Sequence, residues 1–263
     1  MEVSKGLKGK WAIILGASGE VGSTAALKMA NEGVNLCLVY RERKSSLKVV
    51  NELQNELDKT GVEILHYNLD ALKLENRQAV IEELTSKSQN QVCLLVHAIA
   101  KGTLKSLTGV NRATSQDYEI TQYAMAYSLV DWVNSCLDNN LFSENASVIS
   151  LDSEGSQRYI PNYGVVGSTK ASLIKLTQDL AVELAPQHIQ CNAIRAGVMD
   201  SSALNVLESS EIIKQKAKES NPNNRLTTGA DVANAIYLFC LPESSWITGT
   251  VLNVDGGEGL GRS

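Results

Sequence analysis

This sequence lacks the long apolar runs of a membrane protein. No run approaches the roughly 20 apolar residues that a membrane-spanning helix needs. The first ten residues, Met1 to Lys10, are polar, and the five-residue run Trp11–Leu15 is too short for the core of a signal peptide. We therefore expect a cytoplasmic protein with neither a membrane span nor a signal peptide.

Clustered metal or disulfide ligands are also missing. The five cysteines are far apart with no CxxC pair, and the three histidines lack ligand spacing; they are Cys37, Cys93, Cys136, Cys191, Cys240, His66, His97 and His188. Three of the cysteines fall in apolar, strand-like runs, which favours buried thiols in a reducing compartment over disulfides or metal ligands. We expect no metal site.

A basic surface is absent as well. The 24 Lys and Arg residues are scattered and are outnumbered by 29 Asp and Glu residues, which gives a net charge of -5. A protein that binds DNA or RNA usually carries a basic face, so we expect no nucleic-acid partner. What is present is ordinary for a soluble globular protein, because 43% of the 263 residues are hydrophobic and this length can build one sizeable core.

Short apolar runs alternate with helical patterns along the whole chain. The runs expected to form strands are Trp11–Leu15, Val34–Tyr40, Val62–Tyr67, Val92–Ile99, Ser147–Leu151, Ile189–Ile194 and Thr250–Val254. The helical patterns are Ser23–Glu32, Ser46–Lys59, Asn76–Ser86, Ser128–Asn139, Ser168–Leu184 and Ala230–Leu238. Uniformly apolar runs suit a parallel sheet that is covered on both faces. The alternation predicts a Rossmann-type, doubly wound α/β fold of about seven parallel strands, with residues 1–263 in a single domain.

One segment interrupts this alternation. Residues 199–224 have helical character without a strand, and they follow the expected strand Ile189–Ile194. In open α/β sheets, ligands bind beyond the carboxyl ends of the strands. We expect this segment to form a substrate lid; a passive surface excursion is the alternative.

A glycine cluster follows the first expected strand, in the sequence Leu15-Gly16-Ala17-Ser18-Gly19-Glu20-Val21-Gly22. Gly16 would let the chain turn tightly, while Gly19 and Gly22 would allow close approach of a pyrophosphate and close helix–strand packing. Its place between a strand and a helix favours a dinucleotide site over a tight turn without a ligand.

The end of the second expected strand carries the residues that usually choose between the two nicotinamide cofactors. An acidic residue there accepts a hydrogen bond from the ribose 2′-OH, whereas arginine accommodates a 2′-phosphate. Here the sequence reads Arg41-Glu42-Arg43-Lys44. The three cations favour NADPH, Glu42 leaves NADH open, and a solvated loop without ligand contacts is the remaining alternative.

Tyr163 and Lys170, with six residues between them, form the most informative pair. In a helix, residues seven apart are separated by about 10 Å along the axis. The two side chains can therefore join only if Tyr163 lies at or before the start of the helix. Lys170 would bind the nicotinamide ribose, and its charge would favour the anionic character that the phenol needs. An ordinary aromatic residue packed under a loop is the alternative for Tyr163.

With this pair in view, the chain resembles the short-chain dehydrogenase/reductase superfamily and, within it, the enoyl-(acyl carrier protein) reductases. The segment Arg158–Leu173 is similar to that family's active-site segment, where the tyrosine stands further from the lysine than the four residues of ordinary members. That ordinary position is Val166 here, which cannot do the chemistry. Tyr123 stands in place of the usual catalytic asparagine. Three more segments extend the similarity over nearly the whole chain: Val96–Ile99, Asn192–Gly197 and Thr248–Gly257.

The resemblance implies a role for each of a set of residues. Those implied to contact the cofactor, from pyrophosphate and 2′-phosphate to adenine and nicotinamide, are Gly16, Ser18, Gly19, Val21, Gly22, Arg41, Leu69, Asp70, Ile99, Lys170, Met199 and Ser201. Tyr163 is implied to hydrogen-bond the thioester carbonyl of the substrate.

Two departures from the family pattern matter. Many enoyl reductases carry a second active-site tyrosine ten residues before the first; this chain has Ser153, which also falls at the spacing from lysine of a ketoreductase serine. Glu20 stands where relatives often have glycine, and a carboxylate there disfavours a pyrophosphate unless it points outward.

The leading hypothesis is an NADPH-dependent reductase of trans-2-enoyl thioesters, with Tyr163, Lys170 and Ser153 as the catalytic candidates. A ketoreductase or specialised enone reductase, with Ser153 as carbonyl donor, is the alternative. A non-catalytic dinucleotide-binding protein is less favoured, because Tyr163 and Lys170 are both present.

The expected partners follow from the same resemblance. A cluster of cations in or next to the 199–224 segment would receive an acyl carrier protein or form a solvated helix face: Lys214, Lys216, Lys218 and Arg225. The family often forms homo-oligomers, so a tetramer or dimer is expected. Residues Gly259–Ser263 are expected to be a mobile tail.

Overall fold

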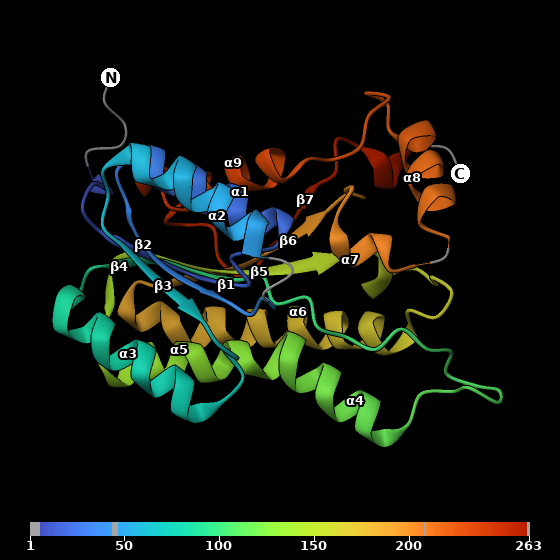
Figure 1. The fold of residues 1–263 in the computed structure, drawn as a ribbon, viewed down its shortest axis with the longest axis horizontal. Coiled ribbons are helices and arrows are strands. Elements are labelled where there is room, and N and C mark those ends of the chain that lie inside the picture. The colour runs from blue at the N-terminus through green and yellow to red at the C-terminus, as the bar shows by residue number, and fades with distance from the viewer. Residues whose placement is uncertain (1–5, 44–46, 208, 262–263) are drawn as a thin grey trace.

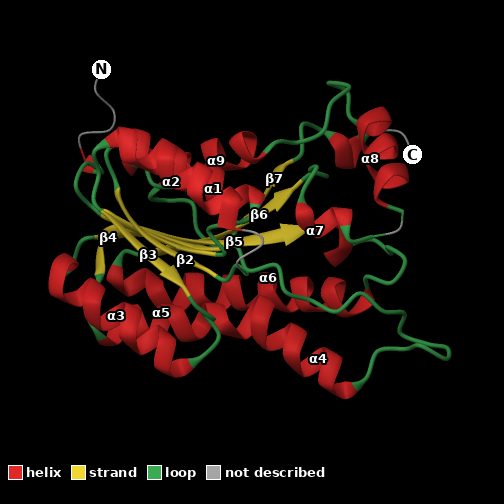
Figure 2. Ribbon diagram, in the orientation of Figure 1, coloured by secondary structure: helices red, strands yellow, loops and turns green. Residues whose placement is uncertain are grey.

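The computed structural model describes residues 6–43, 47–207 and 209–261. Lys44 of the cation run, Ser46 of the second helical pattern, Glu208, Met1–Lys5 and Arg262–Ser263 lie outside these ranges. Within them, seven strands form one sheet in the order β3-β2-β1-β4-β5-β6-β7 (Figure 2). The strands are β1 (Trp11–Leu15), β2 (Asn35–Tyr40), β3 (Ile64–Asn68), β4 (Val92–His97), β5 (Phe142–Ser153), β6 (Gln190–Ala196) and β7 (Val251–Val254).

Every neighbouring pair of strands is parallel. The strand order reverses between β1 and β4, which makes the crevice there the expected place for a dinucleotide. Because all strands run the same way, the loops that follow them meet along a single edge of the sheet. The predicted Rossmann-type fold is confirmed.

Helices cover both faces of the sheet (Figure 1). On one face lie α1 (Glu20–Asn31), α2 (Leu47–Leu57) and α9 (Gly229–Leu238), and on the other lie α3 (Leu74–Ser88), α5 (Ser128–Asp138) and α6 (Gly164–Leu184). Alternate strand residues enter the two cores: Ile14 packs in the first and Ile13 in the second. Burial on both faces explains why the strands are uniformly apolar.

The sequence patterns do not predict one helix, and they predict one strand to be shorter than it is. The missed helix, α4 (Ser115–Gln122), is largely exposed, and it continues through a π-helical turn, Tyr123–Tyr127, into α5. Its start is marked by a capping box between Thr114 and Asp117. β5 begins five residues before the expected Ser147 and ends at Ser153.

Segment 199–224 contains α7 (Ser202–Asn205) and α8 (Ser210–Ser220) and, in its described part, no strand. It lies at the end of the molecule toward which β5 and β6 point (Figure 1). The five cysteines are buried and free, as expected. Over the described ranges, no helix has the length and apolar character needed to cross a bilayer.

Candidate active site

The glycine turn after β1 is shaped to bring backbone close to backbone. Gly16 has φ +82°, and a Cβ there would stand 2.5 Å from the carbonyl oxygen of Ala98. A Cβ on Gly22 would stand 2.3 Å from Gly16 O, so α1 can pack against the turn only without a side chain at this position. Gly19 meets no such obstacle and precedes α1, which starts without a capping side chain. This cradle fits a dinucleotide pyrophosphate.

Two further residues of the first βα unit lie where they leave that cradle open. Val21 is buried against the core, so it presents only its backbone to the turn. Glu20 is exposed, and its Oε1 lies beside Gly229 of α9. The carboxylate of Glu20 is therefore turned toward α9.

Charged residues follow β2 and β3 as expected, and they pair with one another. The Arg41 guanidinium contacts the Asp70 carboxylate at 2.6 Å, and the Arg41 side chain is 64% exposed. Ser18 Oγ, expected near the pyrophosphate, donates instead to Glu42 Oε1 at 2.8 Å. A carboxylate and a guanidinium thus both stand beside the expected adenosine ribose.

The remaining predicted cofactor contacts lie along the same edge of the sheet. Leu69 follows β3 and Ile99 follows β4, and both pack partly buried against one core. Met199 follows β6, packed partly buried against the other core. Ser201 is the N-cap of α7, where its Oγ accepts the Leu204 N–H at 3.3 Å.

The structure brings the three catalytic candidates together. Tyr163 is the residue immediately before α6, which is the position that its spacing from Lys170 requires. Its hydroxyl lies 3.2 Å from Ser153 Oγ at the end of β5. Lys170 Nζ donates to the carbonyl oxygen of Leu151, two residues before Ser153, at 2.6 Å.

Burial sets the electrostatics of this trio. It raises the pKa of the Tyr163 phenol, with a smaller contribution in the same direction from the Asp152 charge, while the hydrogen bond between Tyr163 and Ser153 acts the opposite way. Burial lowers the pKa of Lys170 to about 8, against the attraction of Asp152. A buried lysine with a lowered pKa, held two residues from the serine that contacts a buried phenol, is typical of an acid–base site.

Tyr163 owes its place to a glycine that the sequence patterns did not single out. A Cβ on Gly155 would stand 2.5 Å from the Tyr163 ring, so the ring packs directly on the backbone after β5. A Cβ on Gly167 would likewise stand 2.4 Å from Gly155 O. By contrast, Val166 is buried beside Met125 and cannot face a substrate.

Tyr123 does not reach this trio. Its hydroxyl donates to Asp131 Oδ2 at 2.7 Å and lies 3.2 Å from the carbonyl oxygen of Leu72. These contacts join Tyr123 to α5 and to the residue two before α3, and none of the contacts described joins it to Ser153, Tyr163 or Lys170. His97 is the polar residue that is buried next to the site, with Nε2 2.8 Å from Ser128 Oγ. Burial, reinforced by the Lys170 charge, lowers the pKa of His97 to about 3.

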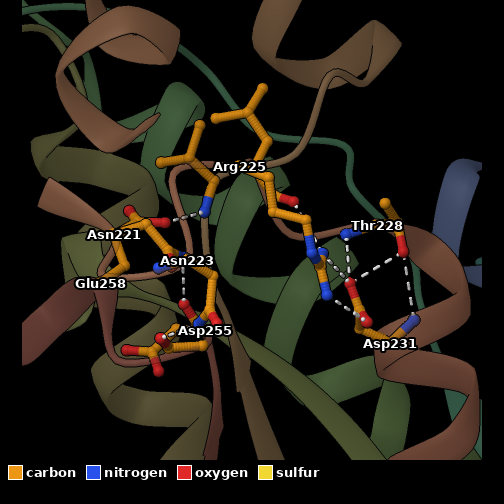
Figure 3. A network of polar contacts seen from close by, with 10 residues as sticks. Asn221, Asn223, Arg225, Thr228, Asp231, Asp255 and Glu258 are labelled. Atoms are coloured by element: carbon orange, nitrogen blue, oxygen red, sulfur yellow. Dashed lines mark hydrogen bonds and ion pairs between the residues drawn. The ribbon is translucent and has the colours of Figure 1, made fainter. Parts of the chain in front are cut away.

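Polar contacts from the C-terminal part of the chain hold both ends of segment 199–224, and Figure 3 shows those around Asn221 and Asp255. Glu258 Oε2 accepts the Val198 N–H at 3.0 Å, just before the segment begins. Asn221 Nδ2 donates to the carbonyl oxygen of Asp255 at 2.8 Å, near its end. The C-terminal turn therefore holds both ends of the expected lid.

The C-terminal residues up to Gly261 are held by contacts and do not form a free tail. Arg158 Nη2 donates to the carbonyl oxygen of Gly259 at 3.0 Å, and a Cβ on Gly261 would overlap Ser220 of α8. The prediction of a mobile tail is wrong for Gly259–Gly261, because this turn packs between the active-site loop and α8.

Two of the four expected carrier-docking cations are already paired. Lys214 contacts Asp200 at 2.8 Å and Glu211 at 2.9 Å, and Arg225 contacts Asp231 at 2.6 Å. Lys216 and Lys218 are exposed. Among the described residues, no group of His, Cys, Asp and Glu side chains is arranged to hold a metal ion.

Known proteins show which family this chain resembles. The family model described as enoyl-(acyl carrier protein) reductase matches residues 16–258. The chain is 31% identical over 234 residues to the enoyl-(acyl carrier protein) reductase (NADH) of Haemophilus influenzae, covering 88% of this chain and 86% of that protein. It is 28% identical over 265 residues to a 3-oxoacyl-(acyl carrier protein) reductase of Aquifex aeolicus, covering 95% and 98%.

A solved structure shares the fold. The enoyl-(acyl carrier protein) reductase of Anaplasma phagocytophilum, in complex with NAD, matches 97% of this chain and 95% of its own with a TM-score of 0.83 at 24% identity. The family match over nearly the whole chain, together with the Tyr163–Lys170 site, places this chain in the enoyl-(acyl carrier protein) reductase family of short-chain dehydrogenases/reductases, which makes it an NAD(P)H-dependent oxidoreductase.

Proposed function

We propose that this protein reduces the carbon–carbon double bond of a trans-2-enoyl thioester with NADPH. The observation that carries the proposal is the placement of Tyr163. It precedes α6 with its hydroxyl 3.2 Å from Ser153 Oγ, while Val166, at the ordinary tyrosine position, is buried. The tyrosine at the spacing typical of the enoyl reductases therefore has its hydroxyl beside Ser153 in the candidate active site.

A bound nicotinamide would supply the hydride, which the β-carbon of the enoyl group accepts. Negative charge then develops on the thioester oxygen. The Tyr163 hydroxyl is placed to donate a hydrogen bond to that oxygen, where a preorganised donor contributes most. Lys170 would hold the nicotinamide ribose and, as an ammonium, favour negative charge on the phenol oxygen. Protonation of the α-carbon completes the reduction.

The choice of NADPH over NADH is the more specific part of this proposal. The Arg41 guanidinium supports NADPH because it is exposed where an arginine accommodates the 2′-phosphate. Its only ion pair among the described residues is with Asp70. Glu42, beside Ser18, supports NADH, which also appears in the name of the Haemophilus influenzae relative.

One observation favours a second function. The Ser153–Tyr163 hydroxyl pair is the one that a ketone reduction would use to bind and protonate a carbonyl. A β-ketoacyl thioester or a specialised enone is therefore the alternative substrate.

The wider setting follows from the proposed reaction. We propose that residues 199–224 act as the substrate lid of a single reductase domain. We further propose that the protein is a cytoplasmic homo-oligomer, and that its substrate is carried on an acyl carrier protein that meets Lys216 and Lys218. Sedimentation of the full chain tests the oligomer, and loss of carrier-bound but not short-thioester turnover in Lys216→Glu/Lys218→Glu tests the docking face.

The function is tested by following NADPH and NADH absorbance with crotonyl and longer enoyl thioesters beside a β-ketoacyl thioester. We expect enoyl-dependent oxidation that Tyr163→Phe loses and that Ser153→Ala only weakens. Turnover of the ketone alone, abolished by Ser153→Ala, would establish the ketoreductase. Dinucleotide binding without turnover of any substrate would indicate a non-catalytic binding protein.

A further inference from the structure

A buried ion pair lies directly behind the catalytic trio. Arg195 of β6 and Asp152 of β5 are register partners, and Arg195 Nε contacts Asp152 Oδ2 at 2.6 Å. Their side chains are 12% and 0% exposed. Replacing such a pair by apolar residues is often neutral for stability, so stability alone does not account for it.

The pair belongs to a row that crosses three strands. Asn253 of β7 is the register partner of Arg195, and Arg195 Nη1 donates to Asn253 Oδ1 at 3.2 Å. Ser156 Oγ, in the turn after β5, donates to Asp152 Oδ2 at 3.0 Å. That turn also contains Gly155, on which the Tyr163 ring packs. The row therefore ties the carboxyl ends of β5, β6 and β7 to the loop beneath Tyr163.

Asp152 lies between the two residues that hold the catalytic groups. The preceding carbonyl, Leu151 O, accepts from Lys170, and the following side chain, Ser153, contacts Tyr163. In the part of the chain that the structure describes, Asp152 Oδ1 is buried without a hydrogen-bond partner. A buried carboxylate oxygen left in this way is uncommon and calls for a functional explanation.

We propose that Asp152 and Arg195 form a positioning pair for the reaction: their contact fixes the end of β5, from which the Leu151 carbonyl holds Lys170 and Ser153 Oγ holds Tyr163. The proposal rests on the proposed reductase function. Neither residue touches the reacting atoms. Both act through Lys170, Ser153 and Tyr163.

The charges around Lys170 support this assignment. Lys170 comes from α6 and contacts β5 at the Leu151 carbonyl, next to Asp152. Arg195, paired with Asp152, lies on β6, His97 lies on β4, and the Tyr163 phenol lies just before α6. Asp152 raises the pKa of Lys170 against the effect of burial, whereas His97 stays neutral because its own pKa is lowered. The carboxylate is thus the fixed negative charge that opposes desolvation of this lysine.

The test measures Lys170 directly, without turnover. The chain is labelled with ¹³C at the lysine ε-carbons, and the Lys170 resonance is assigned with Lys170→Arg and followed against pH. We expect Asp152→Asn to lower the pKa of Lys170 by about one unit, because a neighbouring opposite charge has been removed. In the same variant the alkaline limb of kcat should move to lower pH by a similar amount.

A matched control lies on α5 itself. Asp131 pairs with the buried Arg77 at 3.2 Å, outside the site, so Asp131→Asn should lower stability without moving the Lys170 titration. If Asp152→Asn does not fold, the double variant Asp152→Asn/Arg195→Lys removes the carboxylate, keeps a positive charge at position 195 and should still lower the pKa of Lys170.

Two results would overturn the proposal. One is an unchanged Lys170 titration in the folded Asp152 variant, or in the double variant if the single one does not fold. The other is an equal shift in Asp131→Asn. A wild type that turns over neither thioester would instead contradict the proposed function and leave the Lys170 measurement standing.

Discussion

At the scale of single residues, the two charges after β2 make opposite demands on a dinucleotide. Arg41 points its guanidinium at Asp70, and Glu42 accepts a hydrogen bond from Ser18 next to the glycine turn. A 2′-phosphate would attract the first and be repelled by the second. The sequence alone could place both residues here but could not show that each is already paired.

Replacing these residues one at a time separates their effects. If NADPH is the cofactor, Arg41→Ala should lower kcat/KM for NADPH by about tenfold, which is about 1.4 kcal/mol, and leave NADH nearly unchanged. Glu42→Gln should raise the NADPH-to-NADH ratio, because it removes the repulsion. The ratio of kcat/KM values measures both, and Lys48→Ala, at an 85% exposed side chain, serves as the control. An Arg41→Ala protein with an unaltered ratio would contradict the choice of NADPH.

At the scale of elements, apolar runs and turn residues in the sequence are sufficient to predict the strands of the sheet. They are not sufficient to predict the segments that surround the candidate active site. Strands such as β1 and β4 are continuous apolar runs, so their existence followed from composition. α4 was missed because it carries no apolar stripe. The roles of Gly155, Asp152 and Glu258 depend on contacts between segments distant in sequence, which no local pattern contains.

The turn Glu258–Leu260 is the element whose importance was least expected. It holds Val198 through Glu258, and Asp255 beside it holds Asn221, so both ends of segment 199–224 depend on this part of the chain. Removing residues 258–263 should free the Val198 end of the segment, while the contact between Asn221 and Asp255 remains. Trypsin should then cut after Lys214, Lys216 or Lys218 earlier than elsewhere, as mass spectrometry of timed digests would show.

The control for this truncation is Leu260→Ser, which changes a 91% exposed side chain and should digest like the wild type. Equal cleavage rates in the truncated and intact chains would show that the turn does not hold the segment.

At the scale of the whole molecule, folding buries a titratable imidazole between the sheet and the α5 face. His97 is 1% exposed, and its Nε2 contacts Ser128 Oγ, which itself donates to the carbonyl oxygen of Ala124. This arrangement suits a neutral ring with the proton on Nε2. The unfolded chain carries no such restriction, so the two states take up protons over different ranges of pH.

The sign of the resulting pH dependence follows from linkage. Burial lowers the pKa of His97 from 6.5 to about 3, so between these values the unfolded chain binds a proton that the folded chain does not. The free energy of unfolding should therefore fall as pH falls, by about 2 kcal/mol from this residue between pH 7.5 and pH 5. Urea denaturation at the two pH values should show that His97→Asn loses this part of the pH dependence. His188→Asn, at an exposed left-handed position that asparagine tolerates, should retain it. If the His97 variant followed the wild-type pH profile, a charged or solvated His97 in the folded protein would be the only consistent explanation, and the buried contact with Ser128 would have to be abandoned.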